Sequence, residues 1–309
     1  MSQLDVVTGA FGYTGRYITA HLLETGTSVR TLTGHPNRPN PFGDRVEVAS
    51  LEFADRRKLA EHMRGATTLF NTYWVRFPYG NMTFDRAVAN SEILIQAATD
   101  AQVHRIVHVS ITRSSEDSPF AYFRGKARVE RLIKDSALGY SIIRPTVIFG
   151  KEDILINNMA YLLRRIPVFG IPGSGLYRLR PVSVEDVAAL CVKSRQATTN
   201  EVIDAVGPET FTFEELVRLI ARTVGARTLF VHVPQDIALA AAAVIGRAVG
   251  DVLVTRDELK GLMAELVTEE GPATGSRRLS EWLVQNEKLV GRRYASEVSR
   301  HYRPSTKTT

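Results

Sequence analysis

A tyrosine and a lysine that could move protons stand four residues apart in the stretch AYFRGKARVE. On a helix, Tyr122 and Lys126 share one face and lie one turn apart. An ammonium near a phenol stabilises the phenolate, so the tyrosine becomes a usable general acid or base near neutral pH. The pair follows the apolar run 106–112, IVHVSIT, and this position after a predicted strand favours the chemical interpretation. The alternative is that Tyr122 packs under a sheet and Lys126 is solvated.

Three glycines at intervals of three follow the first apolar run, in VVTGAFGYTGRYI. Gly9 would permit a tight turn, Gly12 would let the backbone approach a pyrophosphate, and Gly15 would bring helix and strand close together. The helix that begins near Tyr13 would point its amide hydrogens at the phosphates. Because the pattern ends a predicted strand and opens a predicted helix, it predicts a dinucleotide site and not merely a structural turn. The other loop residues predicted to contact the cofactor are Phe11, Tyr13 and Thr14.

The residues after the second apolar run bear on which dinucleotide binds. An acid at this strand end would bind the ribose hydroxyls of NAD and repel a 2′-phosphate. The stretch SVRTLTGHPNRP has no acid there. Thr33, His35 and Arg38 could instead meet a 2′-phosphate with a hydroxyl, an imidazole and a guanidinium, which favours NADP over NAD. The alternative is that Arg38 is a solvated loop residue.

Apolar runs rich in β-branched residues alternate with helical patterns through the first half of the chain. This alternation predicts an α/β fold, a parallel sheet covered on both faces by helices. The predicted strands are 4–9, 28–34, 46–50, 67–73, 106–112 and 140–149. The predicted helices are 15–26, 55–65, 84–102 and 125–139. Residues after the third and fourth strands should reach the cofactor: Glu52 and Phe53 near the adenine, and Asn71, Thr72 and Tyr73 above the pyrophosphate and nicotinamide ribose.

The regular alternation ends near residue 150, and this divides the chain. We expect a dinucleotide-binding domain over 1–150, to which the chain returns at about 181–206. Residues 151–309 should form a smaller, mainly helical substrate region, with a helix and then a glycine- and proline-rich loop in INNMAYLLRRIPVFGIPGSG. The aromatic segment YWVRFPY favours an apolar or planar organic substrate, although it could equally be a packed lid. The predicted substrate contacts are Trp74, Arg76, Tyr79, Asn157 and Arg180.

Composition excludes several other classes of function. The 39 Lys and Arg against 33 Asp and Glu leave a charge of +6, spread along the chain without the aromatic interleaving of a nucleic-acid platform. No apolar stretch reaches the ~20 residues of a membrane span. Cys191 is the only cysteine and the N-terminus enters a strand directly, so we expect a cytoplasmic protein without disulfides. We expect no metal site, and a homo-oligomer stays open.

These features together resemble the short-chain dehydrogenase/reductase superfamily. TGAFGYTG, the Tyr122–Lys126 pair and RPTVIFG match its extended and atypical branches. The order of the pieces through about residue 206 is also similar to the NmrA-like proteins and to the dinucleotide-binding accessory subunit of respiratory complex I. The resemblance implies a Rossmann-type doubly wound sheet, Tyr122 as catalytic acid/base and Lys126 as its partner. It also implies that the backbone of Pro145, Thr146 and Val147 holds the nicotinamide carboxamide.

One departure from the family bears on catalysis. Extended members place a catalytic Ser or Thr where this chain has Ile111, and Ser110 and Thr112 on either side are the candidates for that role. The first hypothesis is an NADP-dependent oxidoreductase that transfers hydride between NADP(H) and a small organic carbonyl or alcohol. The second is an NADP-binding redox sensor or scaffold without turnover. The third is an NAD-dependent nucleotide-sugar epimerase or dehydratase.

Overall fold

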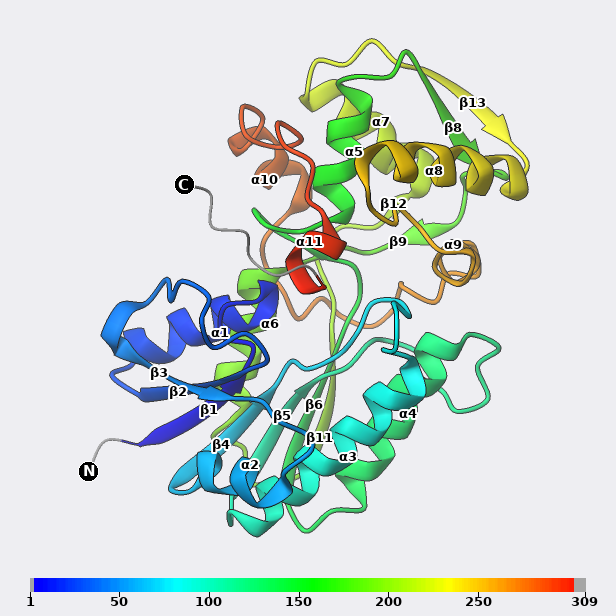
Figure 1. Cartoon of the computed structure of the whole chain (residues 1–309). Helices are drawn as coiled ribbons and strands as arrows, with labels where there is room; N and C mark the ends of the chain where they lie inside the picture. The colour runs from blue at the N-terminus through cyan, green and yellow to red at the C-terminus, as the bar shows by residue number, and fades with distance from the viewer. Residues whose placement is uncertain (1–2, 303–309) are drawn as a thin grey trace. The chain divides into compact units, whose positions relative to one another are not determined.

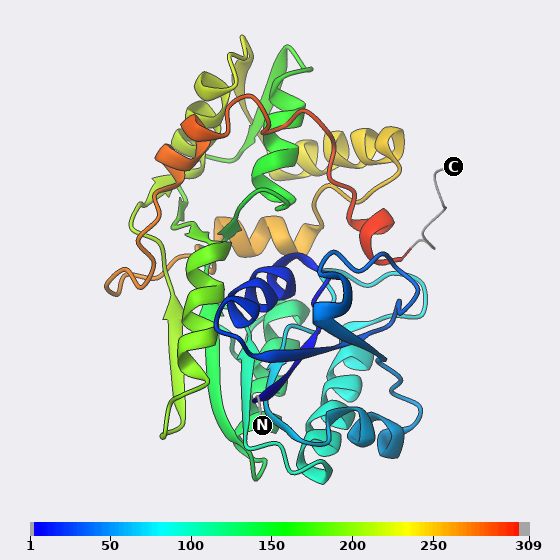
Figure 2. The ribbon, with the colours of Figure 1, turned by 90° about the vertical axis from the view of Figure 1, so that its left-hand side faces the viewer.

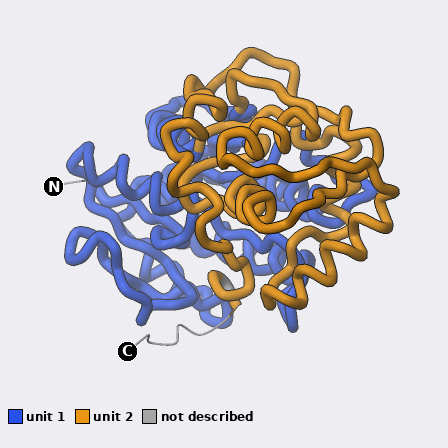
Figure 3. The backbone as a smooth tube through the Cα atoms, turned by 90° about the horizontal axis from the view of Figure 1, so that it is seen from above, with its two compact units in different colours: residues 1–145, 184–205 blue, residues 146–183, 206–309 orange. Residues whose placement is uncertain are grey.

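The computed structural model describes residues 3–302, and the chain divides into two compact units. Unit 1 comprises residues 1–145 and 184–205, and unit 2 comprises 146–183 and 206–309 (Figure 3). The chain therefore leaves unit 1 after Pro145 and returns for one helix and one strand. The sequence predicted that the first domain ends at residue 150 and that the chain returns to it at about 181–206.

Unit 1 is built on a seven-stranded parallel sheet in the order β11-β6-β5-β4-β1-β2-β3. Its strands are β1 (Leu4–Thr8), β2 (Ser28–Thr33), β3 (Val46–Ser50), β4 (Ala66–Asn71), β5 (Arg105–Val109), β6 (Gly139–Pro145) and β11 (Glu201–Ala205). The strand order reverses between β1 and β4, which is where doubly wound sheets bind their ligands. The predicted Rossmann-type α/β fold is confirmed.

Helices cover both faces of this sheet (Figures 1 and 2). They are α1 (Tyr13–Glu24), α2 (Arg56–Met63), α3 (Phe84–Asp100), α4 (Ala121–Lys134) and α6 (Val184–Ser194), and a short 3-10 helix, Gly43–Arg45, precedes β3. Helices α1 and α6 pack side by side on one face, and α2, α3 and α4 follow one another across the other. Side-chain caps start two of them: Asp55 accepts from the Lys58 amide at α2, and Thr83 accepts from the Arg86 amide at α3.

The core of unit 1 forms because its strands carry apolar side chains on both faces, as expected of a parallel sheet covered by helices. Val6, Leu32, Leu69, Ile106 and Ile142 come from five different strands and are all fully buried. The carboxyl edge of this sheet carries the loops that we predict to bind the cofactor.

Unit 2 is mostly helical, as expected. Its helices are α5 (Leu155–Leu163), α7 (Phe213–Thr223), α8 (Gln235–Val249), α9 (Arg256–Met263), α10 (Leu279–Gln285) and α11 (Glu297–His301). Reciprocal capping boxes begin α7, at Thr212 and Glu215, and α9, at Thr255 and Glu258. Such boxes satisfy two otherwise unpaired backbone amides and fix where each helix starts.

Unit 2 also contains short strand pairs that the sequence did not predict in full. The strands are β7 (Ile148–Phe149), β8 (Val168–Pro172), β9 (Arg178–Leu179), β10 (Val182–Ser183), β12 (Phe211–Thr212) and β13 (Leu229–Val233). β8 lies within the predicted glycine- and proline-rich loop and pairs in parallel with β13. No helix within residues 3–302 combines the length and the apolar character needed to cross a membrane.

Candidate dinucleotide site

The glycine turn lies between β1 and α1 and has the geometry of a phosphate-binding loop. Gly9 has φ +67°, a left-handed conformation that L side chains rarely adopt, and its amide donates to the Leu32 carbonyl at 2.8 Å. A Cβ on Gly15 would lie 2.3 Å from the Gly9 carbonyl oxygen, so only glycine lets α1 approach the turn this closely. Gly12 is the N-cap of α1, supplies no side-chain cap, and no acid stands in the first turn. The turn therefore fits a pyrophosphate at the positive end of the helix.

The ends of β1 and β4 are tied together beside this turn. The Thr72 amide donates to the Thr8 hydroxyl at 2.8 Å, and the Thr72 hydroxyl donates to the Thr8 carbonyl at 2.5 Å. Asn71 is fully buried, and its Oδ1 accepts from the Tyr73 amide at 3.0 Å. Its Nδ2 group has no hydrogen-bond partner among the described residues. An unsatisfied buried donor at the strand switch point is consistent with a polar ligand there.

The predicted adenosine side of the site follows β2 and β3. Thr33 is buried, and its hydroxyl accepts from the exposed His35 amide at 3.1 Å, while the Arg38 amide donates to the His35 carbonyl. Thr33, His35 and Arg38 thus belong to one tight loop at the end of β2. After β3, the Glu52 carboxylate pairs with Lys58 at 3.1 Å, and the Phe53 ring lies 4.9 Å from the Tyr73 ring.

Lys126 is buried at the carboxyl end of β5, not solvated. Its Nζ donates to the Val109 carbonyl at 2.9 Å, and its side chain lies under the Trp74 ring with Nζ 5.0 Å from the ring centroid. Burial lowers the pKa of Lys126 to about 7, although the nearby Glu130 carboxylate opposes this. A lysine that changes charge near neutral pH is unusual and marks this strand end as a candidate for proton chemistry.

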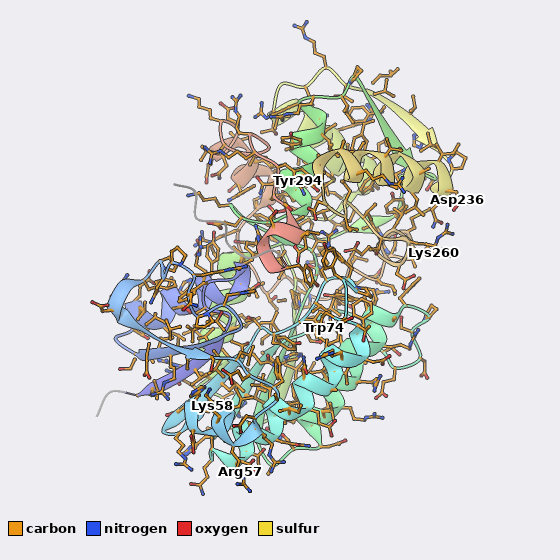
Figure 4. The ribbon with its side chains drawn as sticks, in the orientation of Figure 1. Arg57, Lys58, Trp74, Asp236, Lys260 and Tyr294 are labelled. Atoms are coloured by element: carbon orange, nitrogen blue, oxygen red, sulfur yellow. The ribbon has the colours of Figure 1, made fainter. Side chains whose placement is uncertain are left out.

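Tyr122 lies one turn before Lys126 on α4 and is half-buried in an aromatic cluster. Its ring meets Trp74 edge-on at 6.0 Å and Phe84 edge-on at 5.8 Å. Trp74, labelled in Figure 4, packs so closely on α4 that a Cβ on Gly125 would lie 2.8 Å from its ring. The predicted pair therefore shares one helix face, with an indole ring against both side chains.

A buried carboxylate that sequence reasoning missed organises the remaining candidates. Glu130 is 2% exposed and accepts from the hydroxyls of Ser110 at 2.6 Å and Ser114 at 2.7 Å. It also accepts from the Arg144 guanidinium, with Nε at 3.0 Å. Burial alone raises the pKa of Glu130, but Arg144 and the two serines outweigh it and hold that pKa below its usual value. The Ser110 hydroxyl is thus engaged with a carboxylate inside the unit.

Two further side chains lie buried at the same strand end. The Thr112 hydroxyl is fully buried without a hydrogen-bond partner among the described residues, and the Thr112 amide donates to the Pro145 carbonyl at 3.0 Å. His108 on β5 is the direct neighbour of Asn71 on β4. Burial lowers the pKa of His108 to about 3, so the imidazole is neutral. The sequence offered one signal for Glu130, its spacing of four from Lys126, and none for His108.

Four predicted residues belong to unit 2, where they bond within that unit. The Thr146 hydroxyl donates to the Arg180 carbonyl, and the Val147 carbonyl accepts from the Val182 amide at 2.8 Å. Asn157 is 8% exposed, and its Nδ2 donates to the Asp153 carboxylate at 2.8 Å. The Arg180 guanidinium donates to backbone carbonyls, including that of Gly207 at 2.8 Å. Their predicted contacts with cofactor and substrate stay predictions.

The aromatic loop after β4 supplies the last predicted contacts. The Tyr79 side chain is 42% exposed, and its backbone pairs with Met82. The Arg76 guanidinium lies 5.5 Å from the centroid of the Phe77 ring, which is itself buried. Within residues 3–302, no group of three or more His, Cys, Asp or Glu side chains could hold a metal ion.

A family described as NAD(P)H-binding matches residues 9–197, more than half of the chain. The chain belongs to this NAD(P)H-binding family. The 40 kDa subunit of mitochondrial NADH-ubiquinone oxidoreductase from Neurospora crassa is 28% identical over 262 residues, 82% of this chain and 69% of that protein. A ceramide reductase from Caulobacter vibrioides is 25% identical over 77% of this chain and 76% of its own length. The expected similarity to the dinucleotide-binding accessory subunit of respiratory complex I is confirmed, as is membership of an NAD(P)-binding family.

Solved structures share the fold over nearly the whole chain. A nucleoside-diphosphate-sugar epimerase from Staphylococcus aureus has a TM-score of 0.74 at 16% identity, covering 91% of this chain and 99% of that one. The Citrobacter triphenylmethane reductase complexed with NADP(H) has a TM-score of 0.72 at 16% identity, covering 92% and 99%. Among the sequence relatives, the mitochondrial NADH dehydrogenase (ubiquinone) 1 alpha subcomplex subunit 9 from Arabidopsis thaliana is 28% identical over 77% of this chain, and this chain spans 62% of that relative's length.

Proposed function

We propose that the protein is an NADP(H)-dependent oxidoreductase that transfers hydride between the nicotinamide and an organic carbonyl or alcohol. The observation that carries this proposal is the placement of Tyr122 and Lys126 on one face of α4, with Lys126 at the carboxyl end of β5. That strand end lies on the edge of the sheet that also carries the glycine turn. Membership of the NAD(P)H-binding family supports the cofactor class.

In this proposal, different residues of the chain bind the cofactor and transfer the proton. The glycine turn binds the pyrophosphate, and Asn71 and Lys126 lie at the strand ends where the nicotinamide ribose is expected. Tyr122 gives a proton to the carbonyl oxygen or takes one from the alcohol, and Lys126 favours the phenolate while it is charged. The bound cofactor supplies the hydride, and the protein supplies placement and electrostatics.

Preference for NADP over NAD rests on the loop after β2. Thr33, His35 and Arg38 lie together there, and no acid ends the strand to repel a 2′-phosphate. Burial lowers the pKa of Arg38, although a guanidinium stays charged at any physiological pH. A guanidinium that is partly desolvated before the ligand arrives gives up less hydration on binding a phosphate.

The aromatic surroundings of Tyr122 favour a planar, apolar substrate. Trp74 and Phe84 stack at 6.1 Å with an interplanar angle of 10°, and both present edges or faces to the phenol. A flat organic carbonyl would match these rings better than a sugar nucleotide would. The epimerase hypothesis therefore ranks below a reductase, despite the shared fold.

A second candidate function is an NADP-binding scaffold without turnover. It is favoured by the complex I subunits among the relatives and by Ser110, whose hydroxyl is held by Glu130 while Ile111 occupies the usual catalytic position. A cytoplasmic location and a homo-oligomer stay predictions under either function.

An NADPH oxidation assay against a panel of aldehydes, ketones and quinones tests the proposal. The wild type should oxidise NADPH with at least one acceptor, and Gly12→Val should not. The control is the melting temperature of Gly12→Val, which should stay close to that of the wild type. Tight NADPH binding with no acceptor in the whole panel would favour the scaffold.

A further inference from the structure

Unit 2 contains a pocket of about 630 Å³ that no part of the proposed chemistry uses. It lies where α5 and α7 end, two helices that pack together (Figure 1). Four arginines line it, Arg164, Arg165, Arg227 and Arg292, and no acidic residue is among the lining residues. Such a concentration of one charge in a hollow attracts anions.

Within the part of the chain that the structure describes, these four arginines lack carboxylate partners. Among residues 3–302, none of the four guanidiniums forms an ion pair with a carboxylate. Burial lowers the pKa of Arg164, and the charges of Arg292 and Arg165 add to this effect, whereas Glu287 opposes it. Arg292 and Arg165 therefore lie close enough to repel the charge of Arg164, and a bound anion would relieve that repulsion.

Part of the cluster has a structural use, and part does not. Arg164 donates to the carbonyls of Val224 at 3.0 Å and Glu287 at 2.6 Å, and so caps backbone groups near two helix ends. Arg165 likewise donates to the Tyr161 carbonyl at 3.0 Å. The Arg292 guanidinium makes a single hydrogen bond to the described residues, from its Nε to the Lys288 carbonyl at 3.0 Å, and Arg227 and Arg292 are both exposed. Backbone capping thus explains Arg164 and Arg165 but leaves the guanidinium forks of Arg227 and Arg292 without a role.

We propose that this pocket binds the phosphate group of an anionic ligand, clamped by Arg227 and Arg292 between the capping arginines. Guanidinium forks match phosphate oxygens in pairs, and Thr228 on the pocket wall adds a hydroxyl. The pocket shares no residue with the predicted cofactor and substrate contacts, and every residue that lines it belongs to unit 2.

The rim of the pocket suits a phosphate that carries an apolar group. The lining residues Pro167 and Thr228 directly precede Val168 and Leu229, which face each other across the β8–β13 pair. Val168 is 48% exposed and Leu229 is 63% exposed. A phospholipid headgroup and a free phosphate would both use the arginines, but only the lipid would use these two side chains.

The test compares Arg227→Gln/Arg292→Gln with a matched control, Arg57→Gln/Arg64→Gln, which removes the same charge from exposed positions in unit 1. The probes are sodium pyrophosphate, followed by calorimetry, and vesicles containing phosphatidylglycerol or only phosphatidylcholine, followed by cosedimentation. Loss of two charge-assisted contacts should weaken binding by about a hundredfold, roughly tenfold for each. With NADPH present to fill the glycine turn, the control variant should bind both probes like the wild type.

The two sources of phosphate give different results. A free phosphate ligand predicts pyrophosphate binding that only the pocket variant loses. A lipid headgroup predicts binding to phosphatidylglycerol vesicles but not to phosphatidylcholine vesicles or pyrophosphate. In that case Leu229→Ser should also weaken vesicle binding. In both cases the pocket variant should keep its NADPH affinity, so that failure here leaves the oxidoreductase proposal standing. Equal binding by the pocket variant and the control, or no binding of either probe by the wild type, overturns the inference.

Discussion

Substitution by alanine is predicted to affect different properties at Gly12 and Gly15: NADPH affinity at Gly12 and stability at Gly15. Both have backbone conformations that alanine can adopt, since Gly12 has φ −78° and Gly15 lies in the first turn of α1. A Cβ on Gly12 would meet the Gly9 carbonyl oxygen at 3.1 Å, a contact that a shift of a few tenths of an ångström relieves. A Cβ on Gly15 would meet the same oxygen at 2.3 Å and the Gly9 carbonyl carbon at 2.8 Å. These are backbone atoms, so α1 must move by about 1 Å to relieve the contact, a backbone shift of the kind that overpacking a core causes.

The stability effects follow from these distances. A contact of 2.3 Å with backbone places Gly15→Ala in the upper part of the roughly 1–3 kcal/mol cost of overpacking. Helix propensity returns up to about 1 kcal/mol, so the net loss is about 1–2 kcal/mol. The melting temperature of Gly15→Ala should therefore fall by roughly 2–8 °C, and that of Gly12→Ala should hardly change. Calorimetric titration with NADPH supplies the second readout. Gly12→Ala should weaken NADPH binding while the protein stays folded, because its methyl group occupies the space of the pyrophosphate.

Matched melting curves and NADPH titrations of the two variants can refute this reasoning. An unchanged melting temperature for Gly15→Ala would mean that α1 does not need the close contact with the turn. Unchanged NADPH affinity for Gly12→Ala, with stability also unchanged, would mean that the pyrophosphate does not approach Gly12.

Three further predictions concern charged groups. Arg38→Ala should weaken NADPH binding by about 1.5–3 kcal/mol and leave NADH binding unchanged by calorimetry, and equal losses for both would exclude a 2′-phosphate contact. Glu130→Gln should destabilise unit 1 by about 3–5 kcal/mol in denaturant melts, because Arg144 loses a buried partner. Since the folded-state pKa of Glu130 is lowered, its contribution to the free energy of unfolding is present above the unfolded-state pKa, near 4.5, and is lost as pH falls through the folded-state pKa. The difference in unfolding free energy between the wild type and Glu130→Gln should therefore narrow in acid. Lys126→Met should flatten the rise of wild-type stability between about pH 7 and 10.5, where the folded chain binds fewer protons than the unfolded chain. Parallel pH profiles for wild type and Lys126→Met would show that Lys126 stays charged in the fold.

The parallel sheet of unit 1 was predictable because strands buried on both faces have short continuous apolar sequences. The β8–β13 pair was not predictable. The β8 segment, PVFGIP, has the glycine and prolines typical of a loop, and its partner strand β13 lies about 60 residues later in the chain. Strand pairing over such a separation leaves no local periodicity to find.

The candidate site was predictable to the extent that its chemistry sits in local motifs. Three glycines at a strand–helix junction and a Tyr–Lys pair on one helix are short patterns with a physical reason for each residue. For Glu130 the only local signal is its spacing of four from Lys126, and this does not predict burial, since a glutamate on an amphipathic helix normally faces water. Its burial depends on Arg144 from β6, a neighbour in space and not in sequence.

The most direct test of hydride transfer with Tyr122 as the proton donor or acceptor is single-turnover kinetics of Tyr122→Phe with an acceptor found in the NADPH oxidation panel. The variant keeps the ring that packs on Trp74 and Phe84 and loses only the hydroxyl. We predict NADPH affinity equal to that of the wild type and a hydride-transfer rate lower by about 10²–10⁴, the usual contribution of a positioned acid or base. Transfer at the wild-type rate in Tyr122→Phe would contradict the tyrosine mechanism.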